Sequence, residues 1–139
     1  MGSWIVAGLI AGVVAYLVDW VMWSKVFTTG LDAFVTQMTP EETKRFMGPA
    51  LAKSAVLTLA FGLLLAWFYG RFRGALWVQQ GGALAGMEFA TVLWLPTIFL
   101  AMVGSGVWYA KVRQLQMATC WEWLVRMNAA GLVVGLLMK

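Results

Sequence analysis

Histidine is absent from this 139-residue sequence, and cysteine occurs only once, at Cys120. Without an imidazole the chain cannot build a histidine-ligated haem, a zinc site of the HExxH type, or a Ser-His or Cys-His nucleophilic pair. A single cysteine excludes an intramolecular disulfide, a CxxC redox pair and a cysteine-only metal site. We therefore expect no catalytic residues, no metal and no cofactor, and we expect that the protein is not an enzyme.

Charged residues are also scarce. Only 12% of the residues are charged, 62% are hydrophobic, and the mean hydropathy is +0.80. Soluble domains carry about 25% charged residues, so the composition predicts an all-α integral membrane protein. The net charge is +4, but the basic residues are scattered at the ends of apolar runs, as is typical of membrane-flanking charge. We therefore expect membrane lipids as partners and no nucleic acid, with a homo-oligomer or a larger membrane complex left open.

Four runs are long enough to cross a bilayer as helices, which takes about 20 mostly apolar residues. They cover residues 4–24, 50–70, 81–103 and 119–138, and several of the nine tryptophans lie near their ends, where amphipathic rings prefer the headgroup level. In the third run, Pro96 predicts a kink.

The connection between the first two runs contains a strong helix-start signal. Thr39 can act as N-cap, Pro40 fits the first helical position, and Glu42 completes a capping box. The sequence therefore predicts a short interfacial helix near residues 40–48.

The two halves of the chain match one another. AGLIAG at residues 7–12 aligns with GGALAG at residues 81–86, and Trp20 then falls on Trp94. In the second run of each half, Lys53 falls on Arg126 and Gly62 on Gly135. Shared apolar composition would also produce some matches, but the matched cations and glycines favour a duplication.

We therefore predict a single domain over residues 1–139, built from two tandem two-helix repeats at about 4–70 and 78–138. Each repeat has an even number of spans, so both enter the membrane from the same side. This predicts parallel repeats related by a pseudo-two-fold axis along the membrane normal, forming a four-helix bundle.

Ionisable side chains inside these runs need a partner or a purpose, because each costs about 2.5–3.5 kcal/mol at mid-bilayer. Asp19 and Lys53 have similar depths, and we predict an ion pair between them. In the second half Arg126 is long enough to reach toward Glu88, and Glu122 competes for it from four residues earlier on the same helix face. Two interpretations stay open: the pairs neutralise charge and fix helix register, or they form a polar site or a proton or ion path along the bundle axis.

Small residues indicate where helices approach closely, and simple packing is favoured over a ligand-binding role for them. Asn128 is a further candidate for a hydrogen bond between helices. Six glycines are predicted to lie at helix contacts: Gly8, Gly12, Gly62, Gly81, Gly86 and Gly135.

The order of features resembles that of a known family. A glycine-rich first helix, the aromatic cluster DWVMWSKVF at residues 19–27, a surface segment begun by TPEE at residues 39–42 and three further spans are similar to the domain of unknown function 1761 family. The chain departs from the family pattern in having Trp23-Ser24 rather than Trp-Tyr, and Thr-Thr-Gly at residues 28–30 where Phe-Gly is expected. The resemblance implies a multi-pass protein of the bacterial inner membrane and supplies no activity.

Taken together, these features predict a small, non-enzymatic membrane protein that is accessory or structural, or that binds a lipophilic ligand. The alternative is an oligomeric small-solute, ion or proton transporter or channel that uses the intramembrane carboxylates.

Overall fold

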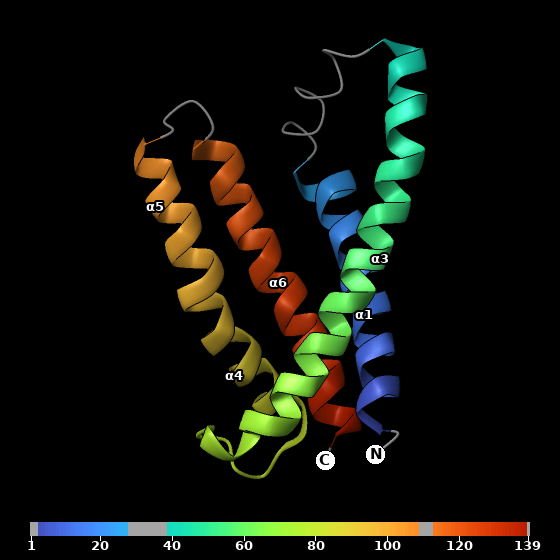
Figure 1. The fold of residues 1–139 in the computed structure, drawn as a ribbon. Helices are drawn as coiled ribbons and strands as arrows, with labels where there is room; N and C mark the ends of the chain where they lie inside the picture. The colour runs from blue at the N-terminus through green and yellow to red at the C-terminus, as the bar shows by residue number, and fades with distance from the viewer. Residues whose placement is uncertain (1–2, 28–38, 109–112, 139) are drawn as a thin grey trace.

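The computed structural model describes residues 3–27, 39–108 and 113–138, and every regular element within them is helical (Figure 1). The predicted all-α class is therefore confirmed for the described part of the chain. Two of the short elements, η1 and η3, are π-helical turns, and η2 is a 3₁₀ turn. The elements are α1 (Ser3–Val21), η1 (Met22–Val26), α3 (Pro40–Phe72), η2 (Arg73–Ala75), α4 (Gly82–Trp94), η3 (Leu95–Phe99), α5 (Leu100–Trp108) and α6 (Arg113–Leu137).

Four helical stretches are long and apolar enough to cross a membrane, as predicted. They are Trp4–Val26, Pro40–Ala75, Gly82–Val107 and Arg113–Leu137. The second and fourth begin earlier than expected, at Pro40 rather than residue 50 and at Arg113 rather than residue 119. Large apolar side chains on these helices point outward, as lipid-facing residues do; Leu57, for example, is 70% exposed.

The start of α3 is a complete capping box, as predicted. The Thr39 hydroxyl accepts the backbone N–H of Glu42 at 3.3 Å, and the Glu42 carboxylate accepts the backbone N–H of Thr39 at 2.9 Å. The prediction of a separate interfacial helix near residues 40–48 is wrong, however. These residues are the first turns of the 33-residue α3, which continues through Pro49. At about 1.5 Å per residue α3 is about 50 Å long against a hydrocarbon layer of about 30 Å, so its charged first turns extend beyond that layer without a separate helix.

The third span is interrupted at Pro96. Proline has no N–H, so Pro96 cannot donate the hydrogen bond of a regular helix to the carbonyl four residues earlier. The chain accommodates it in the π-helical turn η3, where the N–H of Leu100 bonds to the carbonyl of Leu95. The Thr97 hydroxyl donates to the carbonyl of Leu93 in the turn before. The disturbance expected at Pro96 is therefore a π-helical turn between α4 and α5.

Glycines bring α1 and α3 into close contact. A Cβ atom on Gly62 of α3 would collide with the backbone of Gly8 and Gly12 in α1, and would lie 2.7 Å from Gly12 Cα. A Cβ atom on Gly8 would lie 2.8 Å from Leu63 Cα. Only hydrogen atoms at these positions let the two backbones approach so closely.

Helices α4 and α6 pack through an equivalent set. A Cβ atom on Gly135 of α6 would collide with the backbone of Gly82 and would lie 2.9 Å from the backbone nitrogen of Gly86. A Cβ atom on Gly86 would in turn collide with the backbone of Gly131. The prediction for Gly81 needs correction, because this residue is the N-cap of α4 at φ +71°, where a Cβ atom would have nothing within 4 Å.

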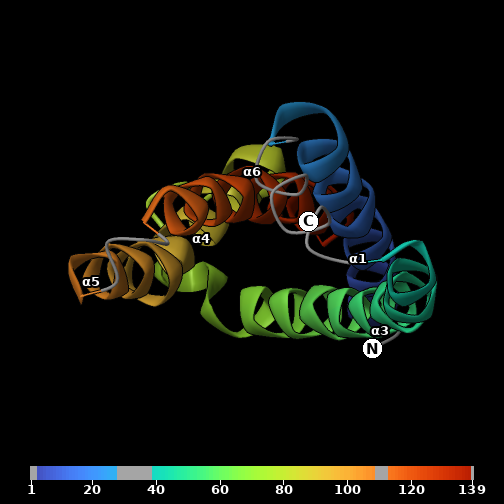
Figure 2. The ribbon, with the colours of Figure 1, turned by 90° about the horizontal axis from the view of Figure 1, so that it is seen from above.

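The spans are neighbours in the order α3, α1, α6, α4. Helix α1 packs along both α3 and α6, and α6 packs along α1, α4 and α5 (Figure 2). Helices α3 and α4 have little contact and come together near the segment that joins them (Figure 1). The largest buried cluster contains Ala11, Ala15, Leu65, Ala66, Tyr69, Leu76, Ala85, Phe89, Ala130 and Val134.

Candidate functional site: a polar node and a lateral cavity

A buried arginine of α6 joins three spans. The Nη1 atom of Arg126 lies 3.4 Å from Asp19 Oδ1 of α1 and 3.4 Å from Glu122 Oε1, one turn earlier in α6. Its Nη2 atom donates to the Thr58 hydroxyl of α3 at 2.8 Å. We call Asp19, Thr58, Glu122 and Arg126 the polar node. It lies near the middle of the 25-residue α6, since Arg126 is about 20 Å from the start of that helix.

Local structure holds the guanidinium in this position. Glu122 and Arg126 stand four residues apart, which puts them on one face of α6. The Arg126 Cζ atom lies 4.3 Å from the ring centroid of Trp123, close enough for a cation–π contact. The Thr58 hydroxyl donates its proton to the Ser54 carbonyl at 2.7 Å, so a lone pair of its oxygen is available to the arginine.

Glu122 and Arg126 are buried, and Asp19 is partly buried. The exposed fraction of the side chain is 1% for Glu122, 9% for Arg126 and 20% for Asp19. Removing one partner of such a pair leaves an uncompensated charge in a medium of low dielectric constant, which is strongly unfavourable. The node therefore fixes α6 against α1 and α3. Two carboxylates share one guanidinium, so the node has one excess negative charge when all three groups are ionised.

The expected Asp19–Lys53 ion pair does not form. Lys53 is exposed, and it makes no ion pair with any residue in the described ranges. It precedes Thr58 by five residues, which is about 140° around the helix. Because Thr58 faces Arg126, the lysine faces away from the node.

Glu88 does not pair with Arg126 either. Its two carboxylate oxygens accept the backbone N–H groups of Trp77 at 2.7 Å and of Val78 at 2.9 Å. The glutamate therefore ties the segment after η2 to α4. A carboxylate that accepts two N–H groups is stabilised without a cationic partner.

Asn128 forms a hydrogen bond between helices. Its Oδ1 accepts the Thr91 hydroxyl of α4 at 3.1 Å, and its Nδ2 donates to the Leu124 carbonyl at 2.9 Å. This bond sets the antiparallel register of α4 and α6. Glu88 precedes Thr91 by nearly one turn and so lies toward the connecting segment, away from the level of Arg126.

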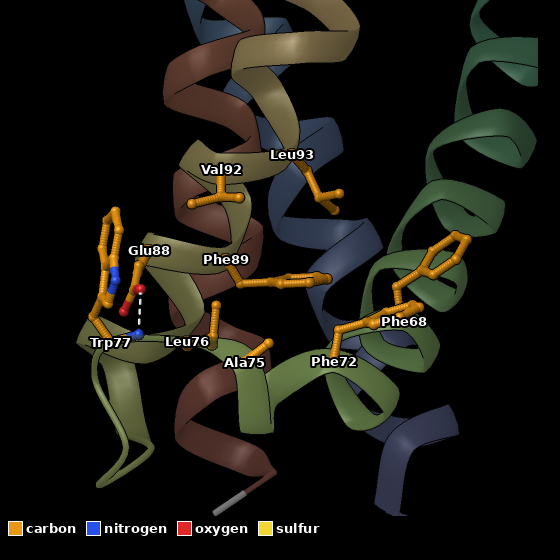
Figure 3. Close-up of a pocket in the computed structure, with 9 residues that line it drawn as sticks. All are labelled: Phe68, Phe72, Ala75, Leu76, Trp77, Glu88, Phe89, Val92 and Leu93. Carbon is orange, nitrogen blue, oxygen red and sulfur yellow. Dashed lines mark hydrogen bonds between the residues drawn. The ribbon is translucent and has the colours of Figure 1, made fainter.

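A lateral cavity of about 450 Å³ opens between α3 and α4 (Figure 3). Phe68 and Phe72 of α3 face Phe89 and Leu93 of α4 across it, and the Glu88 carboxylate turns away toward the Trp77 backbone. The lining is therefore almost wholly apolar. Its members are Phe68, Phe72, Ala75, Leu76, Trp77, Glu88, Phe89, Val92 and Leu93.

The sequence did not indicate Thr58 or the cavity. A threonine inside an apolar run is common, and only the packing of α3 on α6 gives this one an arginine partner. The cavity depends on the distance between α3 and α4, for which the sequence carries no pattern. Within the described ranges, no three Cys, Asp or Glu side chains gather as metal ligands would.

No family model, curated protein or solved structure matches this chain. The resemblance to the domain of unknown function 1761 family therefore stays a prediction. The interpretation of function rests on the polar node and the lateral cavity.

Proposed function

We propose that this chain is a non-enzymatic protein of the bacterial inner membrane that binds a lipophilic molecule, an acyl chain of a membrane lipid, in the lateral cavity. The observation that carries the proposal is an open, apolar cavity of about 450 Å³ between two membrane-crossing helices. Apolar concave sites with few polar groups are typical of sites for lipophilic ligands. Inside a bilayer, the medium next to such an opening is lipid hydrocarbon.

The charges near the cavity suit a lipid headgroup. Arg71 follows the cavity residue Phe68 by three positions, and its Cζ atom lies 5.6 Å from the ring centroid of Trp67. Arg73 follows the cavity residue Phe72 directly. Basic side chains beside an opening between membrane helices favour anionic lipids.

Native mass spectrometry from a mild detergent tests this function. The unmodified protein should retain bound lipid, and Val92→Trp, which puts a bulky ring into the cavity, should release it. Val56→Trp is the matched control, since Val56 is on the exposed face of α3 and is not part of the cavity lining. Equal lipid retention by the two tryptophan variants would refute the proposal.

We also propose that the chain arose by duplication of a two-helix unit, giving the parallel pseudo-two-fold repeats predicted above. The glycine contacts support this, because Gly62 meets Gly8 and Gly12 in the first half, and Gly135 meets Gly82 and Gly86 in the second. These residues correspond one to one in the alignment of the two halves. A homo-oligomer or a larger complex stays a prediction.

Proton or ion passage is the second candidate function. Its specific support is the polar node, where two carboxylates lie 3.4 Å from one guanidinium nitrogen, so a proton can neutralise the excess charge. In liposomes with an imposed pH gradient, the unmodified protein should then conduct protons, and Asp19→Asn should abolish this flux while Glu88→Gln retains it. Absence of flux in the unmodified protein would remove this candidate.

A further inference from the structure

A second hollow, of about 350 Å³, lies at the end of α3. Figure 1 shows this end of α3 on the side of the molecule where α1 begins and α6 ends. We call the hollow the polar pocket; its lining includes Tyr69, Arg73, Gln80 and Gly81. Tyr69 packs edge-on against Phe89 with ring centroids 5.6 Å apart, and Phe89 lines the lateral cavity. The two hollows are therefore neighbours, but one is apolar and the other is polar.

The Tyr69 hydroxyl lacks a partner. Tyr69 is 0% exposed, and its oxygen makes no hydrogen bond with any residue that the structure describes. Buried polar groups in folded proteins are almost always hydrogen-bonded, so an unpaired phenol that lines a pocket points to a bound group.

Arg73 supplies positive charge at the same pocket. Its Nη1 atom donates to the Met138 carbonyl at 2.8 Å, which anchors the side chain between α3 and the end of α6. A guanidinium has five N–H groups, so donors remain for a ligand. None of the described residues lining the pocket is acidic, and the nearby carboxylate of Glu88 is already bound to two backbone N–H groups.

The amino end of α4 opens at this pocket. Gly81 is the N-cap of this 13-residue helix, no side chain caps it, and a Cβ atom on Gly81 or Gly82 would have nothing within 4 Å. Free N–H groups and the helix dipole at such an end attract anions, and phosphate most characteristically.

From this convergence of donors we propose that the polar pocket binds a phosphoryl anion, through the Tyr69 hydroxyl, the Arg73 guanidinium and the amino end of α4. The anion is the headgroup phosphate of a lipid or a free phosphate. The site shares Arg73 with the charges proposed to attract a lipid headgroup, but binding of inorganic phosphate requires no occupant of the lateral cavity.

Two probes applied to the full chain in neutral-lipid nanodiscs test the site. One is inorganic phosphate, followed by broadening of its ³¹P NMR signal. The other is phosphatidylglycerol added to the nanodisc lipids, followed by the anionic lipid retained in native mass spectra. Binding of phosphate identifies a free-anion site, and retention of phosphatidylglycerol alone identifies a headgroup site; either result supports the proposal.

Variants then link binding to the pocket. Arg73→Gln and Tyr69→Phe should each weaken binding of the effective probe about tenfold, as expected for a hydrogen bond to a charged group. Lys53→Gln, which removes an exposed cation of α3 that lines neither the lateral cavity nor the polar pocket, should leave binding unchanged. Circular dichroism verifies that all three variants are folded. Failure of both probes, or affinity in Tyr69→Phe and Arg73→Gln equal to that of Lys53→Gln, would overturn the proposal.

Discussion

Replacing Gly62 with alanine is a direct test of the contact between α1 and α3. The added Cβ atom would lie 2.7 Å from Gly12 Cα and still closer to the Gly8 carbonyl oxygen and the Gly12 nitrogen. Ordinary contacts begin at 3.4 Å, so the helices must separate by about 1 Å. Overpacking costs about 1–3 kcal/mol, and the upper end applies because the opposing atoms are backbone and cannot rotate away. Alanine in place of glycine returns about 1 kcal/mol of helix propensity. We therefore expect a net loss of about 2 kcal/mol in the free energy of unfolding.

The measurement is an SDS titration in mixed micelles, with helix content followed by circular dichroism. Gly48→Ala is the matched control, because Gly48 belongs to the same helix and a Cβ atom there would have nothing within 4 Å. The control should gain up to about 1 kcal/mol, so the two alanine variants should differ by about 3 kcal/mol. Equal unfolding free energies for the two variants would show that α1 and α3 do not meet at Gly62.

Four further substitutions test the other contacts with the same titration. Arg126→Met should lower the free energy of unfolding by about 3–5 kcal/mol, because it leaves two carboxylates without their cation. Lys53→Met should change it by less than about 0.5 kcal/mol, and similar losses in both variants would contradict the assigned ion pairs. Thr39→Ala should lose about 1 kcal/mol with the capping box, and an unchanged midpoint would mean that the start of α3 is frayed. Glu88→Gln should lose about 1–3 kcal/mol, since an amide oxygen can replace only one of the two carboxylate acceptors; no loss would argue against the Trp77 and Val78 bonds.

The accuracy of the sequence predictions depended on the range of the interaction behind each one. The spans and the capping box at Thr39 were predictable, because hydropathy and local hydrogen bonding act within one segment. The contacts of Gly8, Gly12 and Gly62 were also predictable in kind, since small residues spaced by one turn favour close helix approach in any membrane protein.

The ion pairs were not predictable in the same way. Equal depth suggested Lys53 for Asp19, but the choice of partner depends on how α3 and α6 are rotated about their axes. Arg126 reaches Asp19 because it is on the face of α6 that packs on α1. A sequence without aligned relatives contains no information on that rotation, so depth alone chose the wrong cation.

The proposed duplication offers a reason for the unequal packing of the halves. In the alignment of the repeats, Leu93 is the counterpart of Asp19, and Lys53 is the counterpart of Arg126. Asp19 and Arg126 pair where α1 packs on α6. Leu93 and Lys53 cannot pair, and Leu93 instead lines the lateral cavity, where α3 and α4 have little contact. On this reasoning, one carboxylate decides which of two related interfaces closes and which stays open to lipid.

Replacing Asp19 with leucine, the residue of its counterpart, tests that reasoning. The variant should loosen α1 from α6, because Arg126 loses its ion pair with α1. Its one remaining carboxylate partner, Glu122, is on its own helix. Spin labels on the exposed residues Val21 and Leu115, in a Cys120→Ala background, report the separation of the two helices by pulsed dipolar spectroscopy. We expect a longer and broader distance distribution in Asp19→Leu and an unchanged one in Asp19→Glu, which keeps the charge. An unchanged distribution in the leucine variant would mean that α3 alone holds α1 and α6 together, through its glycine contact with α1 and its Thr58 bond to α6. The open cavity would then have another cause.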